Sequence, residues 1–189
     1  MKNLIFFQVL LLSFSLLFIT SCEEDDPCEL ITCLNDGVCV NGTCDCEDGF
    51  TGPDCSDQIT PSSMRITNIR VTRFPATDAN GSSWDLTNGA DIFIEMAYND
   101  EAIYTHPTTI DNVEGGQTYD FVPATNLHMN NVTDTYELSL LDDDGLEGDE
   151  FLGGISFTPY SSNNKFPTIL SLDVANGAVA FELTVEYTF

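Results

Sequence analysis

The sequence is poor in basic residues and in histidine. It holds 5 lysines and arginines and 2 histidines against 31 aspartates and glutamates, a formal net charge of −26 at pH 7. Proteins that bind nucleic acid neutralise phosphates with lysine and arginine, so this composition excludes nucleic acid as a partner. The same shortage argues against docking of basic side chains on anionic lipid. Divalent cations are the natural counter-ions for so many carboxylates.

The sequence also lacks the motifs of common enzyme classes. Its two histidines, His106 and His128, stand in no zinc-protease motif, and there is no nucleophile elbow, P-loop or dinucleotide-binding fingerprint. We therefore expect a protein that is not an enzyme. A glycosidase needs only two carboxylates, so a hydrolase or an accessory subunit of a surface polysaccharide-degrading system stays as an alternative.

The one long apolar run lies at the N-terminus. LIFFQVLLLSFSLLFI follows a single cation at Lys2 and precedes the small residues Thr20 and Ser21. This pattern predicts a signal peptide over residues 1–21. A retained membrane-spanning helix is the weaker interpretation, because such a helix needs about 20 apolar residues with flanking anchors.

The seven cysteines are an odd number, and six of them form one block between Cys28 and Cys55. Cys22 is left over. Residues 19–22, Ile-Thr-Ser-Cys, resemble the bacterial lipobox, which implies that Cys22 is lipidated, with palmitate as a typical acyl chain, and anchors the protein in a membrane. The alternative is ordinary secretory cleavage near Ser21, which would leave a reactive free thiol.

Residues 22–27 form an acidic tether, with four consecutive acids directly after Cys22. Such a run can be a solvated linker. It also resembles the acidic signal that sends some Gram-negative lipoproteins to the outer surface. That resemblance implies a lipid-anchored protein of the outer membrane, exposed at the cell surface.

Residues 28–55 hold six cysteines in a segment too short to enclose a hydrophobic core, so cross-links must stabilise it. Spacing alone leaves about fifteen disulfide connectivities. A zinc site is the competing use of clustered cysteines. Closely spaced cysteines with no nearby histidine, behind an export signal, favour disulfides.

This segment resembles the EGF-like domain, most clearly in CDCEDGF at residues 44–50 and in the closing Gly52 and Cys55. The resemblance implies three disulfides: Cys28 with Cys39, Cys33 with Cys44, and Cys46 with Cys55. Calcium-binding members of that family carry an aromatic residue in a loop that is too short here, at residues 40–43. We therefore expect no calcium in this module, which serves as a spacer or binds a ligand.

Residues 56–63, SDQITPSS, predict a linker, and residues 64–189 have the length of one domain. Apolar and polar residues alternate over residues 179–189, and shorter stretches elsewhere repeat the pattern of a half-buried strand. No segment after the signal peptide shows helical periodicity. The predicted fold class is all-β: a small disulfide-rich EGF-like module followed by an antiparallel β-sandwich.

Two loops of this second domain concentrate acidic residues. In LLDDDGLEGDEFLGG, Asp142 and Asp144 point to one side of an extended segment, and Glu150 returns to the same end. Asp78 opens an earlier loop, and Asp91 closes it. Loops at one end of a sandwich can bring their carboxylates together, and Ca²⁺, with six to eight oxygen ligands, would relieve their repulsion. The alternative is a pair of solvated turns.

The two loops resemble those of the C2 domain, a calcium- and phospholipid-binding sandwich. The resemblance covers the whole second domain and implies five calcium ligands: Asp78, Asp91, Asp142, Asp144 and Glu150. The sequence departs from the family in having Glu150 in place of an aspartate, extra residues such as Asp85 in the first loop, and no basic strand for phosphoinositides. Calcium is therefore better supported than lipid binding.

Trp84, the only tryptophan, lies in the first acidic loop. It either contacts a ligand or covers the core. The sequence thus predicts a surface-exposed, lipid-anchored calcium-binding protein that acts as a binding or adhesion module, with an unidentified protein, glycan or lipid as ligand. A purely structural envelope lipoprotein is the further alternative.

Overall fold

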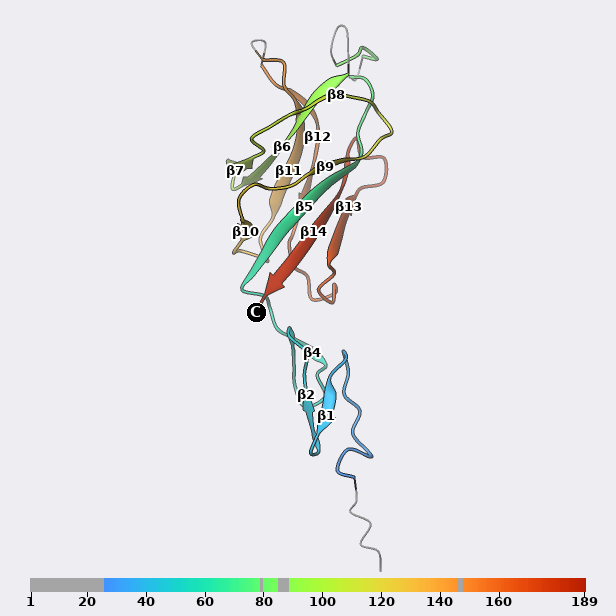
Figure 1. Ribbon diagram of the computed structural model, residues 1–189, viewed down its shortest axis with the longest axis vertical. Coiled ribbons are helices and arrows are strands. Elements are labelled where there is room, and N and C mark those ends of the chain that lie inside the picture. The colour runs from blue at the N-terminus through green and yellow to red at the C-terminus, as the bar shows by residue number, and fades with distance from the viewer. Residues whose placement is uncertain (1–25, 79, 85–88, 146–147) are drawn as a thin grey trace, which may run out of the picture.

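The computed structural model describes residues 26–78, 80–84, 89–145 and 148–189 (Figure 1). The predicted signal peptide, Cys22 and most of the acidic tether lie outside this range. All regular secondary structure in the described part is strand, which confirms the predicted all-β class. The described part of the chain contains no helix that is long and apolar enough to span a bilayer.

The strands run in chain order as follows: β1 (Val38–Val40), β2 (Thr43–Asp45), β3 (Phe50–Thr51), β4 (Asp57–Gln58), β5 (Ser63–Arg73), β6 (Ala90–Tyr98), β7 (Glu101–Thr105), β8 (Ile110–Val113), β9 (Tyr119–Phe121), β10 (Leu127–Met129), β11 (Tyr136–Asp142), β12 (Glu150–Phe157), β13 (Ile169–Asp173) and β14 (Ala180–Thr188). Every strand pair is antiparallel.

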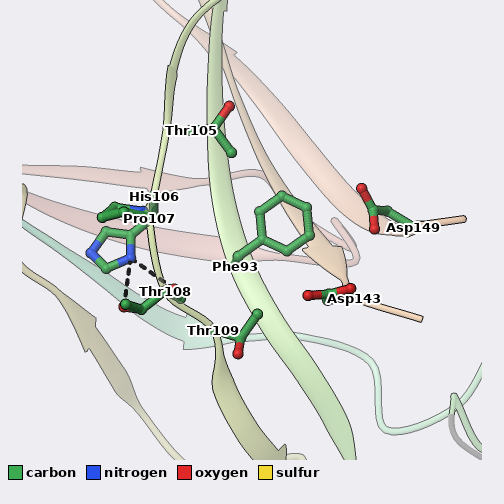
Figure 2. A pocket seen from close by; sticks show the side chains of 8 residues that line it. All are labelled: Phe93, Thr105, His106, Pro107, Thr108, Thr109, Asp143 and Asp149. Atoms are coloured by element: carbon green, nitrogen blue, oxygen red, sulfur yellow. Dashed lines mark hydrogen bonds between the residues drawn. The ribbon is translucent and has the colours of Figure 1, made fainter. Parts of the chain in front are cut away.

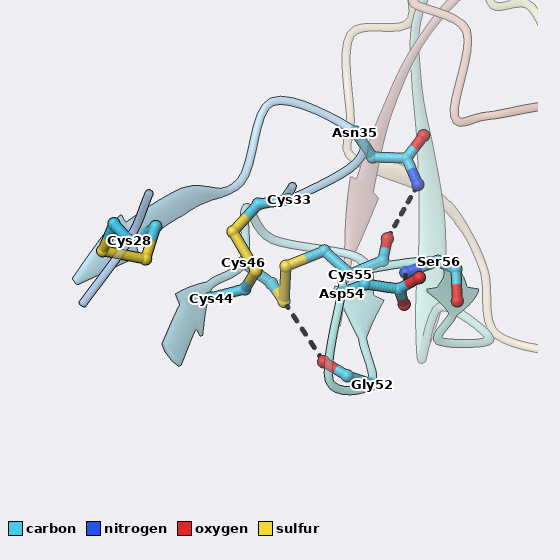
Figure 3. The surroundings of a disulfide bond; sticks show 10 residues. Cys28, Cys33, Asn35, Cys44, Cys46, Gly52, Asp54, Cys55 and Ser56 are labelled. Carbon is cyan, nitrogen blue, oxygen red and sulfur yellow. Dashed lines mark hydrogen bonds between the residues drawn. A yellow bond between two sulfur atoms is a disulfide. The ribbon is translucent and has the colours of Figure 1, made fainter. Parts of the chain in front are cut away.

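The disulfide module, residues 28–55, is held by cross-links instead of a core. Its three disulfides join Cys28 to Cys39, Cys33 to Cys44 and Cys46 to Cys55 (Figure 3), the pairing that the EGF-like resemblance implies. Only two short ladders accompany them, β1 with β2 and β3 with β4. In a segment of this size, disulfides restrict the unfolded chain and so supply the stability that apolar burial cannot.

The sandwich, residues 64–189, consists of two five-stranded sheets. One has the order β10-β5-β14-β13, with β9 also pairing with β5, and the other has the order β12-β11-β6-β7, with β8 also pairing with β6. Their facing sides enclose one hydrophobic cluster that draws on both sheets, with Phe121, Phe181 and Leu138 among its fully buried members. The antiparallel β-sandwich predicted from the sequence is confirmed.

The alternating pattern in the sequence marks the buried face correctly. Phe181, Leu183 and Val185 of β14 are at most 2% exposed, because alternate residues of a strand point to the same side. Phe189 belongs to the same alternation but is 43% exposed, since it lies past the end of β14, where the sandwich meets the disulfide module.

The predicted linker, residues 56–63, is bound to both of its neighbours. Its strand β4 pairs with β3 of the disulfide module, and the backbone N–H of Ser62 donates to the carbonyl of Thr188, 2.7 Å away. Pro61 is buried. The composition predicted a separating segment, whereas the backbone hydrogen bonds of this segment are made with the two folded parts.

The outer face of β5 carries all three arginines of the described chain. Each pairs with an acid on another strand or at its end: Arg65 with Glu186, Arg70 with Asp120, and Arg73 with Asp173. The hydrogen bond from Arg70 lowers the pKa of Asp120 below its ordinary value, with a further contribution from Asn68. On the solvent side, two of these pairs link β5 to its neighbours β14 and β9, and the pair of Arg73 with Asp173 reaches β13, which lies beyond β14.

Core packing predicts the response to truncation. Replacing the fully buried Leu138 by Ala should lower the free energy of unfolding by about 2–5 kcal/mol, because it removes buried methyl groups and leaves a cavity. Val122 is 64% exposed, so Val122→Ala should change the free energy of unfolding by less than about 0.5 kcal/mol. Urea denaturation of both variants measures the difference, and equal losses would contradict the assigned core.

The ion pair of Asp120 predicts a pH dependence. Since its folded-state pKa is lowered, its stabilising contribution is complete above the ordinary pKa of about 3.9 and is lost as the pH falls through the lower, folded-state value. Between pH 5 and pH 2 the stability of Asp120→Asn should therefore fall less steeply than that of the wild type. Chemical denaturation at a series of pH values tests this, and parallel curves would count against it.

Candidate metal centre

Strand β11 carries a carboxylate into the end of the core. Its inward-facing residues are Tyr136, Leu138 and Leu140, and the next position in the alternation is Asp142, which is 0% exposed. Among the described residues, Asp142 is the one buried charged side chain. A carboxylate in such a place is costly unless hydrogen bonds or a cation compensate the loss of water.

The β11–β12 hairpin then places a second carboxylate beside the first. A shift in register between Leu140 and Leu141 fits an extra residue into β12, after which Asp142 pairs directly with Glu150. Like charges directly opposite each other on neighbouring strands destabilise a sheet. This ladder therefore ends on a pair that is unfavourable without a counter-charge.

Asp144 completes the metal cluster, which we define as Asp142, Asp144 and Glu150. One carboxylate oxygen from each lies within 4.8 Å of the others. Asp142 is buried, Asp144 is half-buried and Glu150 is exposed, so the cluster leads from the core to solvent. Three carboxylates without histidine or cysteine form a hard oxygen donor set, which suits Ca²⁺ or Mg²⁺ and not zinc.

Asp91 contacts the cluster through its backbone. Its N–H donates to Oδ1 of Asp142 at 2.5 Å, and its carbonyl accepts from the N–H of Asp143 at 2.9 Å. Its own carboxylate accepts a 2.7 Å hydrogen bond from the backbone N–H of Asn112, a residue of β8. Asp91 thus positions Asp142, while its side chain fastens the start of β6 to β8.

Asp78 closes its own loop. Oδ1 accepts hydrogen bonds from the backbone N–H groups of Asn80 at 2.8 Å and Ser82 at 2.7 Å. The bond from Ser82 is the largest cause of a lowered pKa for Asp78. Of the five predicted calcium ligands, the structure groups the three from the second loop, and the carboxylates of Asp78 and Asp91 serve local turns and strand ends.

Trp84 faces the protein's own core. Its indole is half-buried against the hydrophobic cluster, and Nε1 donates to the carbonyl of Pro75 at 2.8 Å. Covering the core accounts for both its apolar surface and its N–H group. A contact between Trp84 and a ligand stays a prediction. Asp85 lies outside the described residues.

The alternate acids of the same hairpin face away from the metal cluster. Asp143 and Asp149 line a pocket of about 240 Å³ with Phe93 and residues 105–109 (Figure 2). Figure 2 shows both carboxylates on one side of the Phe93 ring, with His106 on the other. Asp143 and Asp149 are not among the site residues predicted from the sequence, although the two-residue period of a strand already separates them from Asp142 and Glu150.

The disulfide module has a counterpart among known protein families. Residues 26–55 match the family model of the EGF-like domain. Among curated proteins, no significant match was found.

The second part has structural neighbours among C2 domains. A structure described as that of a C2 domain has 14% identity and a TM-score of 0.42, covering 67% of this chain and 98% of that one. A C2 domain of plant extended synaptotagmin 1 has 16% identity and a TM-score of 0.38, covering 69% and 97%. A C2 domain protein from Ramazzottius varieornatus has 15% identity and a TM-score of 0.37, covering 68% and 89%. These likenesses concern the fold, and the candidate metal site is argued from the geometry of this chain alone.

Because Asp142 and Glu150 repel each other, removing the charge of Glu150 should stabilise the metal-free protein. In the presence of a chelator, Glu150→Gln should raise the free energy of unfolding by about 0.2–1 kcal/mol, the usual size of a cross-strand pair. Glu137→Gln, an exposed change on β11 away from the cluster, is the matched control and should have little effect. Thermal or urea denaturation in chelator checks both. A destabilised Glu150→Gln would show that the carboxylates do not repel each other.

Proposed function

We propose that this protein binds Ca²⁺ through Asp142, Asp144 and Glu150, and that it acts as a lipid-anchored binding or adhesion module at the cell surface. The observation that carries the proposal is the fully buried carboxylate of Asp142, paired across the ladder with Glu150 and close to Asp144. The three arginines of the chain pair with other acids, namely Glu186, Asp120 and Asp173. A divalent cation would supply the positive charge that they do not bring to this cluster.

Electrostatics explain why the cation matters. The three carboxylates lie within 4.8 Å of one another and repel, although solvent weakens the repulsion because Asp144 is half-buried and Glu150 is exposed. Calcium takes six to eight oxygens and tolerates irregular geometry, so three carboxylates with backbone carbonyls and water suffice. Mg²⁺ demands a stricter octahedral arrangement, which favours calcium at a site on a hairpin end.

The position of the cluster connects calcium to recognition. It lies where β11 ends and β12 begins, at the end of the sandwich farthest from the disulfide module (Figure 1). Calcium there joins the two strands of the hairpin and so fixes the surface next to it. This surface includes the pocket of Asp143 and Asp149. A ligand would therefore meet a calcium-ordered end that points away from the membrane attachment.

Membrane attachment through Cys22 is the second part of the proposal. The lipobox-like sequence before Cys22 and the acidic run after it support a lipid anchor and surface display. Several acyl chains on one residue hold a protein on a membrane far more firmly than one chain does. The 31 acidic residues make a direct attraction to anionic headgroups unfavourable, so the anchor supplies the membrane affinity.

Calcium should raise the melting temperature of the wild type. At ten times a Kd of about 10⁻⁴–10⁻³ M, binding stabilises the fold by about 1.4 kcal/mol, which corresponds to about 3–6 °C. Asp142→Asn and Asp144→Asn should each remove most of this rise. Differential scanning calorimetry with calcium and with chelator makes the measurement.

Asp100→Asn is the matched control for these variants. Asp100 lies in the β6–β7 turn with a φ of 63°, a conformation that asparagine adopts readily, and it is exposed. This variant should keep the full response to calcium. A response that persists in Asp142→Asn and Asp144→Asn would place the ion elsewhere.

Lipidation can be tested in the native host. Labelled palmitate should be incorporated into the wild type and not into Cys22→Ala, and the variant should leave the membrane fraction. Protease treatment of whole cells then tests surface exposure, since a displayed sandwich is accessible before the cells are opened. Labelling of Cys22→Ala equal to that of the wild type would refute the anchor.

A further inference from the structure

We propose that the disulfide module is docked rigidly on the sandwich by an aromatic junction, so that the two parts move as one body. The aromatic junction consists of Phe50, Tyr160, Phe166, Tyr187 and Phe189. Domains joined by a short segment move relative to each other unless their interface is extensive and apolar. This inference does not depend on the metal centre.

Phe166 is the centre of the aromatic junction. Its ring makes edge contacts with Phe50 of the disulfide module, at a centroid distance of 5.4 Å, and with Phe189 at 4.8 Å. It also contacts Tyr187 edge-on at 5.6 Å and stacks on Tyr160 at 5.7 Å with an interplanar angle of 10°. One side chain thus joins β3 to the loop and the strand end at the base of the sandwich.

Gly49 shows that the fit is close. It is buried, has a φ of 90°, and a Cβ added there would come within 2.6 Å of ring atoms of both Phe166 and Phe189. The backbone of the disulfide module therefore lies directly against two rings of the aromatic junction. A loose encounter between separate parts does not require a glycine at the contact.

Hydrogen bonds surround the aromatic junction. Lys165 Nζ donates to Oδ1 of Asn35 at 3.1 Å, and Nδ2 of the same Asn35 donates to the carbonyl of Cys55 at 2.8 Å (Figure 3). On β4, Nε2 of Gln58 donates to the carbonyl of Ser162 at 3.0 Å. Directional bonds of this kind fix the angle between the two parts, which apolar contact alone leaves free.

The disulfide between Cys46 and Cys55 keeps the docking surface of the small module rigid. It closes the loop that carries Gly49 and Phe50, and the carbonyl bound by Asn35 belongs to Cys55 itself. Cys55 is 0% exposed. This cross-link holds the docking residues in place before the sandwich is met, so the module needs no core of its own to make the contact.

The consequence is a spacer of fixed direction. The sequence predicted a module and a sandwich separated by a linker, which would let the far end of the sandwich sample many orientations. With a rigid aromatic junction, that end keeps one distance and one direction relative to residue 28, where the module begins.

Nuclear magnetic resonance relaxation of the full chain in detergent tests this inference. In the wild type, backbone amides of residues 28–55 and of the sandwich strands should report one rotational correlation time. In Phe166→Ala and in Gly49→Ala, the amides of residues 28–55 should report a clearly shorter time than the sandwich strands. Phe151→Ala, which removes a 63% exposed ring away from the aromatic junction, is the matched control and should keep a single time.

Mass spectrometry must first show that the three disulfides are intact in each variant, which separates loss of docking from loss of folding. If wild-type residues 28–55 already tumble faster than the sandwich, the proposal is wrong. It is equally wrong if Phe166→Ala and Gly49→Ala both keep a single correlation time with their disulfides formed. Calcium is left out of these samples, so the outcome is independent of the proposed metal centre.

Discussion

The structure depends on a carboxylate that the strand alternation of β11 carries into the end of the sandwich core. Asp142 occupies an inward position that Leu138 and Leu140 fill with apolar side chains, and the register of the hairpin sets Glu150 opposite to it. Apolar packing holds the strand in this register, so the charges cannot separate without loss of core contacts. The backbone N–H of Asp91 compensates one oxygen, and a divalent cation would compensate the remaining charge of the cluster.

The two ends of the molecule use different physical means to stay ordered. The disulfide module has almost no buried apolar surface and relies on three cross-links, while the sandwich has a continuous core between its sheets. Between them, Phe166 and its neighbouring rings bring apolar side chains of both parts into contact. The metal cluster and the aromatic junction therefore lie at opposite ends of one sandwich (Figure 1).

The sequence predicted those features that follow from short-range patterns. Alternation identified the buried faces of β6, β11 and β14, the cysteine pattern implied the disulfides, and the two-residue spacing of Asp142 and Asp144 indicated a shared side. The sequence did not predict features that depend on exact backbone geometry or on distant contacts. The register that pairs Asp142 with Glu150 depends on a bulge, and the hydrogen bonds of Asp78 and Asp91 depend on the conformation of the loops around them. Phe166 contacts Phe50 across more than a hundred residues of sequence.

Anomalous scattering from a crystal grown with calcium would locate the ion. We expect an ion bound by carboxylate oxygens of Asp142, Asp144 and Glu150 at about 2.3–2.6 Å, the usual range for calcium. An ion bound at another place, or three carboxylates that stay together with no ion at saturating calcium, would contradict it.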